Sequence, residues 1–282
     1  MQRNTAMSNL HSTIFFQNSE EIHLKNTLNL ARKIIYFIRA GADKPESFDT
    51  IYSQNRDSIV LSLYDVPNWR IPDECIVIGG GLSKYQAFSK IRKFLDFSYV
   101  FLLDADIKLP NFVEHSLLSK INHKSFNCLQ FSLCDESHTA HSFLMKRGES
   151  DFRRVNFVEV MAPIFSQCGM DIVLHTFPMS ISTWGLDIAW SKLFDGNGMY
   201  VMDSQTMTHL GKPDLVDGPF YRYLNSLGID PRVEMRRLMA DFDSRNILFG
   251  DVPPLVNGYF YAKMKWFYRN KVLGYDTGNR VC

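Results

Sequence analysis

The sequence predicts an α/β fold in which a central mixed sheet is flanked by helices. The first observation is a series of short apolar runs bounded by turn residues, the pattern of buried strands in a parallel sheet. The second is that helical patterns lie between some of these runs. The third is bulk composition, since 282 residues with 45% apolar side chains can build a substantial core. No linker divides the chain, so we expect one domain with a helical C-terminal extension.

Four apolar runs form the first half of the expected sheet, at residues 33–39, 58–64, 75–78 and 99–103. Ligands bind beyond the carboxyl ends of the strands in such sheets. The residues that close the four runs are therefore expected to gather at one edge: Arg39, Asp65, Gly81 and Asp104. Further strand-like runs follow at residues 128–133, 157–161 and 200–202.

Helices are expected after Ser83, where Ser83 and Gln86 form a capping box, and over residues 111–121 and 186–194. The chain then divides into three parts. We expect residues 1–30 to form an N-terminal arm or helix, residues 31–215 to contain the sheet and its helices, and residues 216–282 to form a helical, aromatic-rich extension packed on it.

Charge and cysteine content exclude several classes of function. Thirty-one basic and thirty acidic residues nearly cancel, which disfavours a protein that binds nucleic acid through its phosphates. The five cysteines form no Cys-x-x-Cys pair, so neither a zinc site nor a disulfide framework is indicated.

The first 25 residues lack a signal-peptide core, and no run of apolar residues is long enough to span a bilayer. We expect a cytoplasmic protein.

Two Asp-x-Asp triplets occur, and their contexts differ. Asp241 and Asp243 follow a mixed-charge helical stretch, which is typical of a solvated helix end. Asp104 and Asp106 follow the apolar run YVFLL, so two like charges meet at the end of a buried strand. Mg²⁺ or Mn²⁺ shared with a diphosphate would relieve their repulsion and desolvation. The pattern therefore favours a metal and phosphate site at Asp104 and Asp106.

At this point the sequence resembles the GT-A glycosyltransferases, in which an apolar strand leads into an Asp-x-Asp motif. The resemblance spans roughly residues 33–210 and is strongest at YVFLLDADIKL (99–109) and at STWGLD (182–187). The second stretch is similar to an uncharacterised bacterial and plant family placed near these enzymes. The resemblance implies a hexosyltransferase-like enzyme of polysaccharide biosynthesis. Its donor would be a nucleotide sugar, with a UDP-sugar favoured, and its acceptor a carbohydrate or a lipid-linked glycan.

The resemblance also implies a metal shell. Asp104 and Asp106 would hold Mn²⁺ or Mg²⁺ at the donor diphosphate, and a His in a late loop would complete the set. His209 fits that place best, because it follows the strand-like residues 200–202 and precedes Leu210-Gly211. A surface or core histidine is the alternative.

Four residues are expected to bind the donor beside Asp104. Arg39 closes the first strand, and the resemblance places Asp65 near the base or ribose, although a turn before Pro67 is the alternative. Gly81 and Lys84 belong to GGGLSK, where small residues and a cation beside a helix N-terminus suit a phosphate. A tight turn with a solvated lysine is the plainer interpretation.

Trp184 and Asp187 are expected to serve the acceptor. In inverting GT-A enzymes an acidic residue that opens a late helix removes the proton of the acceptor hydroxyl, and Asp187 stands at such a place. Compensation of the helix dipole is the alternative. Trp184 would offer a flat face to a sugar ring.

Two questions remain open from sequence. Residues 259–275 interleave basic and aromatic side chains, which suits either peripheral contact with the inner face of the membrane or packing on the core. A sugar nucleotidyltransferase and a non-catalytic nucleotide-sugar-binding protein are the alternative functions.

Overall fold

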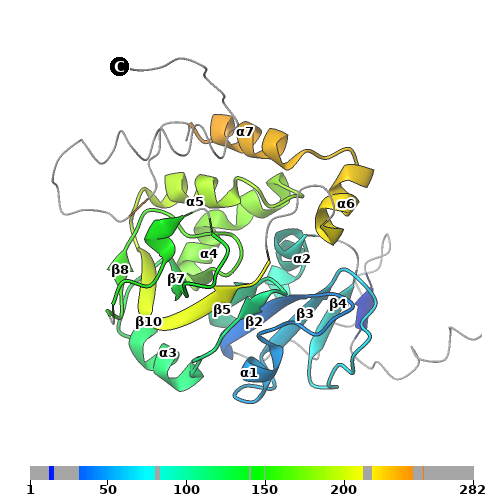
Figure 1. Cartoon of the computed structure of the whole chain (residues 1–282), viewed down its shortest axis with the longest axis horizontal. Coiled ribbons are helices and arrows are strands. Elements are labelled where there is room, and N and C mark those ends of the chain that lie inside the picture. Colours follow the sequence, from blue (N-terminus) through cyan, green and yellow to red (C-terminus); the bar gives the residue numbers. More distant parts are fainter. Residues whose placement is uncertain are drawn as a thin grey trace, which may run out of the picture.

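The computed structural model describes residues 13–15, 32–79, 83–139, 141–148, 150–211, 218–243 and 250. These residues build a mixed sheet between two layers of helices (Figure 1). The strand order is β1-β4-β3-β2-β5-β9-β7-β10-β6, and β8 pairs with β10. In chain order the strands are β1 (Thr13–Phe15), β2 (Arg32–Ala40), β3 (Ile59–Leu63), β4 (Ile76–Gly79), β5 (Phe97–Leu103), β6 (Ile107–Lys108), β7 (Cys128–Leu133), β8 (Arg153–Arg154), β9 (Ile164–Ser166) and β10 (Met199–His209).

The strands from β1 to β5 are parallel, and β9 runs antiparallel to both β5 and β7. Two registers decide where the polar residues lie. Ile38 of β2 pairs with Leu103 of β5, which sets Arg39 beside Asp104 where the two strands end. Ile107 of β6 pairs with His209 of β10, which brings Asp106 next to the end of β10. The expected gathering at one sheet edge is therefore produced by strand pairing.

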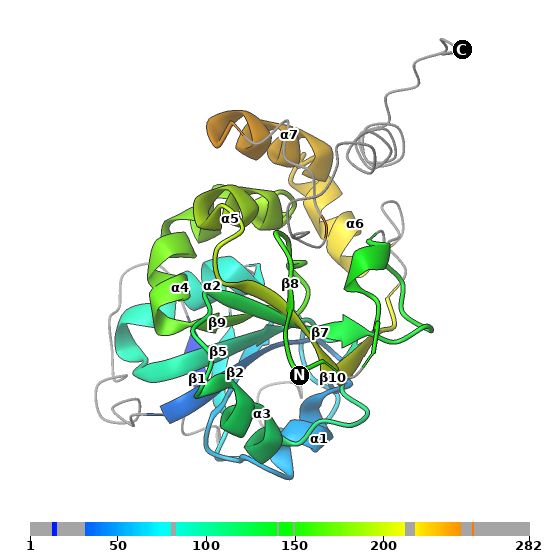
Figure 2. The same cartoon turned by 90° about the vertical axis from the view of Figure 1, so that its left-hand side faces the viewer.

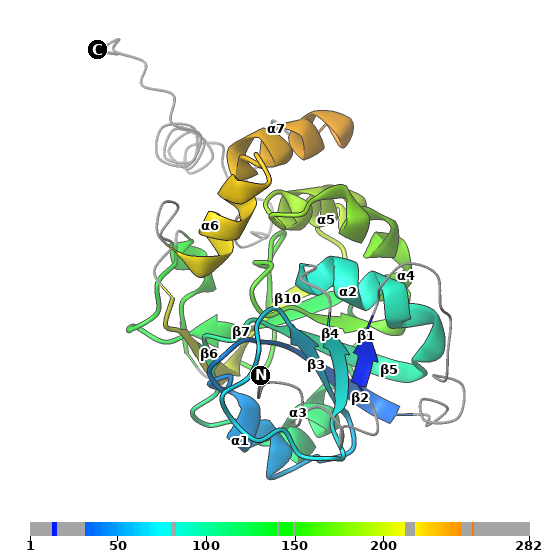
Figure 3. The same ribbon diagram turned by 90° about the vertical axis from the view of Figure 1, so that its right-hand side faces the viewer.

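Helices cover both faces of the sheet, as the three ribbon views agree (Figures 1, 2 and 3). On one face lie α2 (Lys84–Ile91), α4 (Gln167–Val173) and α5 (Leu186–Phe194), and on the other lie α1 (Phe48–Tyr52) and α3 (Glu114–Ile121). Beyond α5 lie α6 (Pro219–Ser226) and α7 (Pro231–Asp241). The described residues also form three short 3-10 helices, η2 (Arg92–Phe94), η3 (Ser142–Leu144) and η4 (Leu174–Met179). No helix in these described ranges is long and apolar enough to cross a membrane.

Aromatic side chains form the contact between the sheet and the layer of α2 and α5. The ring of Tyr85 lies 4.7 Å from that of Phe177 and 5.2 Å from that of Trp190, and Phe165 of β9 lies 5.1 Å from Trp190. All four side chains are fully buried. Aromatic pairs at these distances add to the free energy of burial, so the layer is held firmly to the sheet.

The predicted strands 33–39, 58–64, 75–78, 99–103 and 128–133 are confirmed, as is the helix 186–194. The capping box of Ser83 and Gln86 is also present. Residues 200–202 belong to a longer strand, and the helix expected from residue 111 begins at Glu114. Within residues 1–30, where we expected an arm or a helix, the described residues Thr13–Phe15 form a strand.

The strand expected at residues 157–161 is wrong. Phe157 and Val158 are buried, as a strand would have them, but the stretch pairs with no described strand, and several of its backbone groups bond to side chains. The N–H of Glu159 donates to Gln130 Oε1 at 2.7 Å, and the carbonyl of Val160 accepts from Lys84 and Tyr85. Such bonds satisfy buried backbone groups without a ladder.

Candidate functional site

The Asp104-Ala105-Asp106 turn is held by backbone hydrogen bonds from three separate parts of the chain. The N–H of Asp104 donates to the carbonyl of Met161 at 2.9 Å, and the N–H of Glu46 donates to that of Ala105 at 2.9 Å. The N–H of Leu210 donates to the carbonyl of Asp106 at 3.1 Å. The two carboxylates remain 37% and 41% exposed. The turn is thus fixed in position while its side chains stay accessible.

Lys84 contacts Asp104 from the buried side of the turn. Its amine lies 2.9 Å from Asp104 Oδ1 and also donates to the carbonyls of Leu102, Val160 and Met161 at 2.8–3.1 Å. The Lys84 side chain is 2% exposed. The expectation that it presents its amine to a phosphate is therefore corrected: all of its donors are used inside the protein, and it braces Asp104 instead.

The two carboxylates of the turn have opposite electrostatic environments. Burial raises the pKa of Asp104, and the charge of Asp106 raises it further, while Lys84 opposes both effects. Desolvation also raises the pKa of Asp106, but the hydrogen bond and charge of His209 outweigh it and leave that pKa below its usual value.

His209 faces Asp106 across the end of the sheet. Its Nε2 lies 3.4 Å from Asp106 Oδ2, and its Nδ1 lies 2.7 Å from the carbonyl of His138. Desolvation lowers the pKa of His209, but Asp106 raises it to about 9. A carbonyl partner fixes a proton on Nδ1, so once the second proton leaves, the lone pair is on Nε2 and faces Asp106.

Gly211 allows this close arrangement. A Cβ at position 211 would stand 1.9 Å from Asp106 Oδ2 and 3.5 Å from His209 Nε2. Any other residue would therefore displace the carboxylate. Glycine at position 211 therefore lets the backbone that follows β10 pass close to the Asp106 carboxylate.

Arg39 lies buried on the other side of the turn. Its guanidinium donates to Ser62 Oγ at 3.0 Å and lies 4.9 Å from the centre of the Tyr64 ring. Burial lowers the pKa of Arg39 to about 10, and the charge of Asp104 acts against this. Asp65 is exposed, and its Oδ1 accepts the N–H of Val66 at 2.7 Å, as the turn interpretation expects. Arg39 therefore lies beside Asp104 at the sheet edge, whereas Asp65 is on the surface next to it.

Two expectations lie outside the described residues: Gly81, and the basic-aromatic segment 259–275.

The loop that carries Trp184 is anchored by Glu234 of α7. The Glu234 carboxylate accepts the N–H of Ser182 at 2.7 Å, the N–H of Ile181 at 3.0 Å and the hydroxyl of Ser180 at 3.1 Å. These bonds outweigh desolvation and lower the pKa of Glu234. Thr183, next in the loop, has φ +69, a strained value for a β-branched residue.

Gly185 lets α7 approach the start of α5. It has φ +87, and a Cβ there would lie 2.9 Å from Met235 Cα. With Glu234 on the same helix, this contact fixes the path of the chain from residue 180 into α5. Trp184 and Asp187 are therefore placed by a helix that comes later in the sequence.

Asp187 is the second residue of α5, and the residue at the N-cap is Gly185. Asp187 Oδ1 accepts the N–H of Ile188 at 2.9 Å. Burial raises the pKa of Asp187 to about 7, although backbone N–H groups, including that of Val160, act to lower it. The carbonyl of Val160 also accepts a hydrogen bond from Lys84, which contacts Asp104. Val160 therefore links Asp187 to the residues around Asp104.

Glu159 is a functional candidate that the sequence pattern did not reveal. Its side chain is 16% exposed, and burial raises its pKa to about 8, with the charge of Asp187 adding to the effect. Its Oε1 lies 3.4 Å from Thr139 Oγ1, and its Oε2 has no hydrogen-bond partner among the described residues. The sequence does show one acidic residue within the apolar stretch FVEVMA (157–162). Because this stretch was predicted to be a strand, the acid did not stand out as a site residue.

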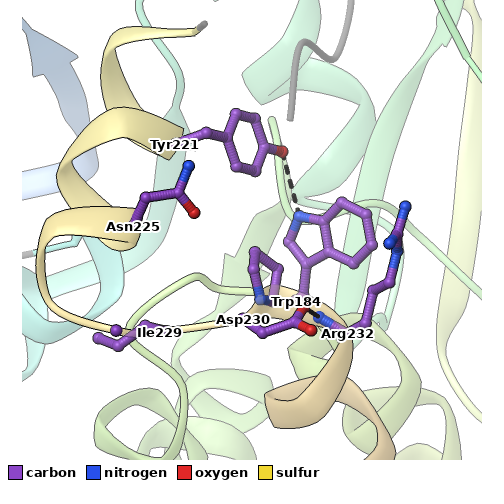
Figure 4. Close-up of a pocket in the computed structure, with 8 residues that line it drawn as sticks. Trp184, Tyr221, Asn225, Ile229, Asp230 and Arg232 are labelled. Atoms are coloured by element: carbon purple, nitrogen blue, oxygen red, sulfur yellow. Dashed lines mark hydrogen bonds between the residues drawn. The ribbon is translucent and has the colours of Figure 1, made fainter. Parts of the chain in front are cut away.

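A pocket of about 320 Å³ opens between Trp184 and the α6–α7 pair (Figure 4). Trp184 Nε1 donates to the hydroxyl of Tyr221 at 3.2 Å, which joins α6 to the anchored loop. Burial raises the pKa of Tyr221, as do the charges of Asp104 and Asp106, so the pocket lies within electrostatic range of the turn. The residues that line it are Trp184, Tyr221, Asn225, Gly228, Ile229, Asp230, Pro231 and Arg232.

The geometry thus brings Arg39, Asp104, Asp106 and His209 to one sheet edge, with Trp184 and Asp187 close by. In the described ranges no group of three or more His, Cys, Asp or Glu side chains is arranged to hold a metal ion by itself. A metal here would need oxygen ligands from a substrate and water.

Comparison with known proteins supports the fold. The family model described as "Protein of unknown function (DUF707)" matches residues 93–242. Among solved structures, the chain is similar to GalNAc-T7 with UDP, GalNAc and Mn²⁺, at a TM-score of 0.50 and 11% identity over 84% of this chain and 54% of that chain. It is also similar to S. aureus TarS residues 1–349, at a TM-score of 0.49 and 9% identity over 88% of this chain and 73% of that chain.

The chain spans about half the length of the GalNAc-T7 chain. No curated protein matches the sequence. At this identity the likeness to GalNAc-T7 concerns the fold alone, and it confirms the predicted GT-A-like arrangement of a central sheet flanked by helices.

Proposed function

We propose that this chain, which belongs to the DUF707 family, is a metal-dependent glycosyltransferase that moves a sugar from a nucleotide-diphosphate sugar to a glycan or glycolipid acceptor. The observation that carries the proposal is the meeting of Asp104, Asp106 and His209 at the carboxyl edge of a GT-A-like sheet. Function is argued from this site, since a fold alone hosts many reactions.

The residues present fit a divalent cation. Asp106 Oδ2 and the Nε2 of His209 face each other at 3.4 Å, and the bond from Nδ1 to a backbone carbonyl is the usual second contact of a metal-binding imidazole. Asp104 keeps one carboxylate oxygen free of Lys84. Oxygen and imidazole ligands of this kind suit Mn²⁺ or Mg²⁺ bound together with phosphate. Such an ion, when bound, neutralises the diphosphate and polarises its bond to the sugar.

The donor diphosphate is placed against this edge. Arg39 is the cation beside Asp104 that is not consumed by protein carbonyls, so it supplies charge where the phosphates lie. Tyr64, which is 44% exposed and packs over Arg39, continues the surface toward Asp65. Asp65 then meets the ribose or base. We favour a UDP-sugar, because UDP is the nucleotide in the GalNAc-T7 structure of the same fold.

Asp187 is proposed as the general base for the acceptor hydroxyl, which implies inversion at the sugar carbon. A base works best when its pKa lies near the operating pH, and burial brings that of Asp187 to about 7. In its ionised form it takes the proton of the acceptor hydroxyl as that oxygen attacks the anomeric carbon, while the bond from that carbon to the nucleoside diphosphate breaks and the diphosphate leaves. Trp184, three residues earlier, offers the acceptor a flat apolar face in the pocket.

Calorimetric titration of UDP with and without Mn²⁺ tests the metal site. We expect Mn²⁺ to tighten UDP binding to the native protein and to have little effect on Asp106→Asn. Asp241→Asn is the matched control, because Asp241 is an exposed member of the other Asp-x-Asp triplet, at the end of α7. Metal-independent UDP binding of equal strength in native protein and Asp106→Asn would refute the proposal. Release of pyrophosphate from a nucleoside triphosphate, in place of UDP from a UDP-sugar, would indicate a nucleotidyltransferase.

A further inference from the structure

We propose that the pocket between Trp184 and the α6–α7 pair binds a saccharide that carries an anionic group, a carboxylate or a phosphate, and that Arg232 binds this group. The inference deepens the proposed function, since it names the acceptor as an acidic glycan. The binding step itself does not depend on the donor or the metal, so it can be tested without either.

The apolar wall of the pocket is fixed before any ligand binds. The indole of Trp184 is oriented by its bond to the Tyr221 hydroxyl, and its loop is held by the three hydrogen bonds to Glu234. A rigid aromatic face loses little entropy when a ligand lies against it. Pockets of a few hundred Å³ with an apolar wall and a few polar groups are the usual form of small-ligand sites, and this one has about 320 Å³.

The polar groups of the pocket match the hydroxyl groups of a sugar. Asn225 lines it from α6, and its side-chain amide has no hydrogen-bond partner in the described part of the chain, so it can both donate and accept. Asp230 uses one oxygen to accept the N–H of Arg232 at 2.8 Å and keeps the other. Figure 4 shows the Asn225 amide directed into the space between Tyr221 and Trp184.

Arg232 is the group that sets the charge of the ligand. Its guanidinium lies beside the indole of Trp184, on the side away from Tyr221 (Figure 4), and has no ion-pair or hydrogen-bond partner among the described residues. It is the second residue of α7, where the helix dipole disfavours a cation. An unpaired arginine at this place is stabilised by a bound anion, and its planar fork matches a carboxylate or phosphate.

Among the described residues, neither neighbouring acid forms an ion pair with the Arg232 guanidinium. Glu234 is committed to the loop at residues 180–182, and the bonded oxygen of Asp230 caps α7. Of the residues that line the pocket, Arg232 and Asp230 carry charge. An anionic group on the ligand can therefore pair with the Arg232 guanidinium, an interaction that a neutral sugar lacks.

The experiment measures glycan binding to the full chain without UDP-sugar or Mn²⁺. The probes are a panel of oligosaccharides of mixed linkage in three matched sets: neutral hexose chains, the same chains with a uronic acid, and the same chains with a phosphate. Native protein is compared with Arg232→Gln and with Arg236→Gln. Arg236 is the matched control, because it is an exposed arginine one turn further along α7 and does not line the pocket.

We expect the tightest ligands to be acidic and to weaken with added salt. Arg232→Gln should reduce their affinity by about tenfold or more, the value of a charge-assisted hydrogen bond, and leave the neutral chains unchanged. Arg236→Gln should change neither set. The acidic set that responds, uronic acid or phosphate, identifies the source of the anion.

Three results would overturn the inference. One is equal binding of neutral and acidic chains, another is no binding by any acidic chain, and the third is an equal effect of the two arginine substitutions. The UDP titration with Asp106→Asn is independent of all three, so failure of the acidic pocket and failure of the proposed transferase are distinguished.

Discussion

Replacement of Glu234 by alanine should loosen the acceptor side of the site while leaving the donor side intact. Glu234 lies on α7, outside the sheet, and its carboxylate accepts two backbone N–H groups and one hydroxyl from residues 180–182. That loop positions Trp184 and leads into α5, where Asp187 lies. The substitution removes all three hydrogen bonds at once and introduces no new charge.

The size of the effect follows from the contacts. Hydrogen bonds to a charged group contribute about 1.5–3 kcal/mol each, but Glu234 is only half-buried, so water replaces part of what is lost. We therefore expect the free energy of unfolding to fall by about 2–4 kcal/mol in Glu234→Ala. For a protein of this size that corresponds to a decrease of roughly 4–10 °C in Tm. Without the hydrogen bonds to Glu234, nothing in the loop holds Thr183 in its strained backbone conformation, so we expect the loop to relax.

Steady-state transfer kinetics separate the two roles that Glu234 could have. We expect the acceptor KM to rise and kcat to fall, with the KM for the nucleotide sugar unchanged. Glu114→Ala is the control, because Glu114 accepts the Tyr36 hydroxyl at 2.7 Å and the Asn55 amide at 3.0 Å on the opposite helical layer. If both variants lose stability and neither changes the acceptor KM, Glu234 only holds the fold and the reasoning is refuted.

The pH dependence of stability gives a second check. The folded state lowers the pKa of Glu234 below its usual value of 4.5, because the loop donors outweigh desolvation. A depressed carboxylate contributes stability that is fully present above the unfolded pKa and is lost as the pH falls through the folded pKa. The difference in stability between native protein and Glu234→Gln should therefore be constant above pH 5 and shrink in more acidic solution.

Three further substitutions test other parts of the site. His209→Ala should raise the Mn²⁺ concentration needed for half-maximal activity, and a change in melting temperature alone would make His209 a structural residue. Asp187→Asn should melt close to the native temperature and retain UDP binding but lose roughly 10²–10⁴ in transfer rate, whereas near-normal transfer would exclude it as the base. Glu159→Gln should flatten the pH dependence of stability: because the folded pKa is about 8 against 4.5, native stability falls as the pH rises between these values, and an unchanged profile would show that Glu159 is not buried as described.

Much of the fold and the position of Arg39 beside Asp104 could be predicted from sequence, because local patterns decided them. Apolar runs that end in polar residues predicted the strands, and the ends of two of those strands placed Arg39 and Asp104 together. What failed depended on distant partners. Lys84 has the sequence context of a phosphate ligand, yet its amine turns inward to carbonyls that lie about 20 and 80 residues away.

The same limit applies to the acceptor side. No local pattern around Trp184 shows that a carboxylate more than 50 residues later anchors its loop. Glu159 was hidden because burial of Phe157 and Val158 gives the periodicity of a strand even where the backbone bonds to side chains. Contacts between residues that are far apart in the chain depend on the tertiary fold. They leave no local spacing pattern from which a single sequence would predict them.

The cations around Asp104 and Asp106 have a thermodynamic consequence. Lys84 and Arg39 already balance the two carboxylates, and with a pKa of about 9 His209 adds a further positive charge at neutral pH. If the proposed site is correct, a divalent ion on its own would find little net attraction and would have to displace a proton from His209, whereas a diphosphate would be attracted by these cations. Each ligand would improve the site for the other, so their binding would be positively coupled, and by reciprocity the diphosphate would raise metal affinity by the same factor by which metal raises that of the diphosphate.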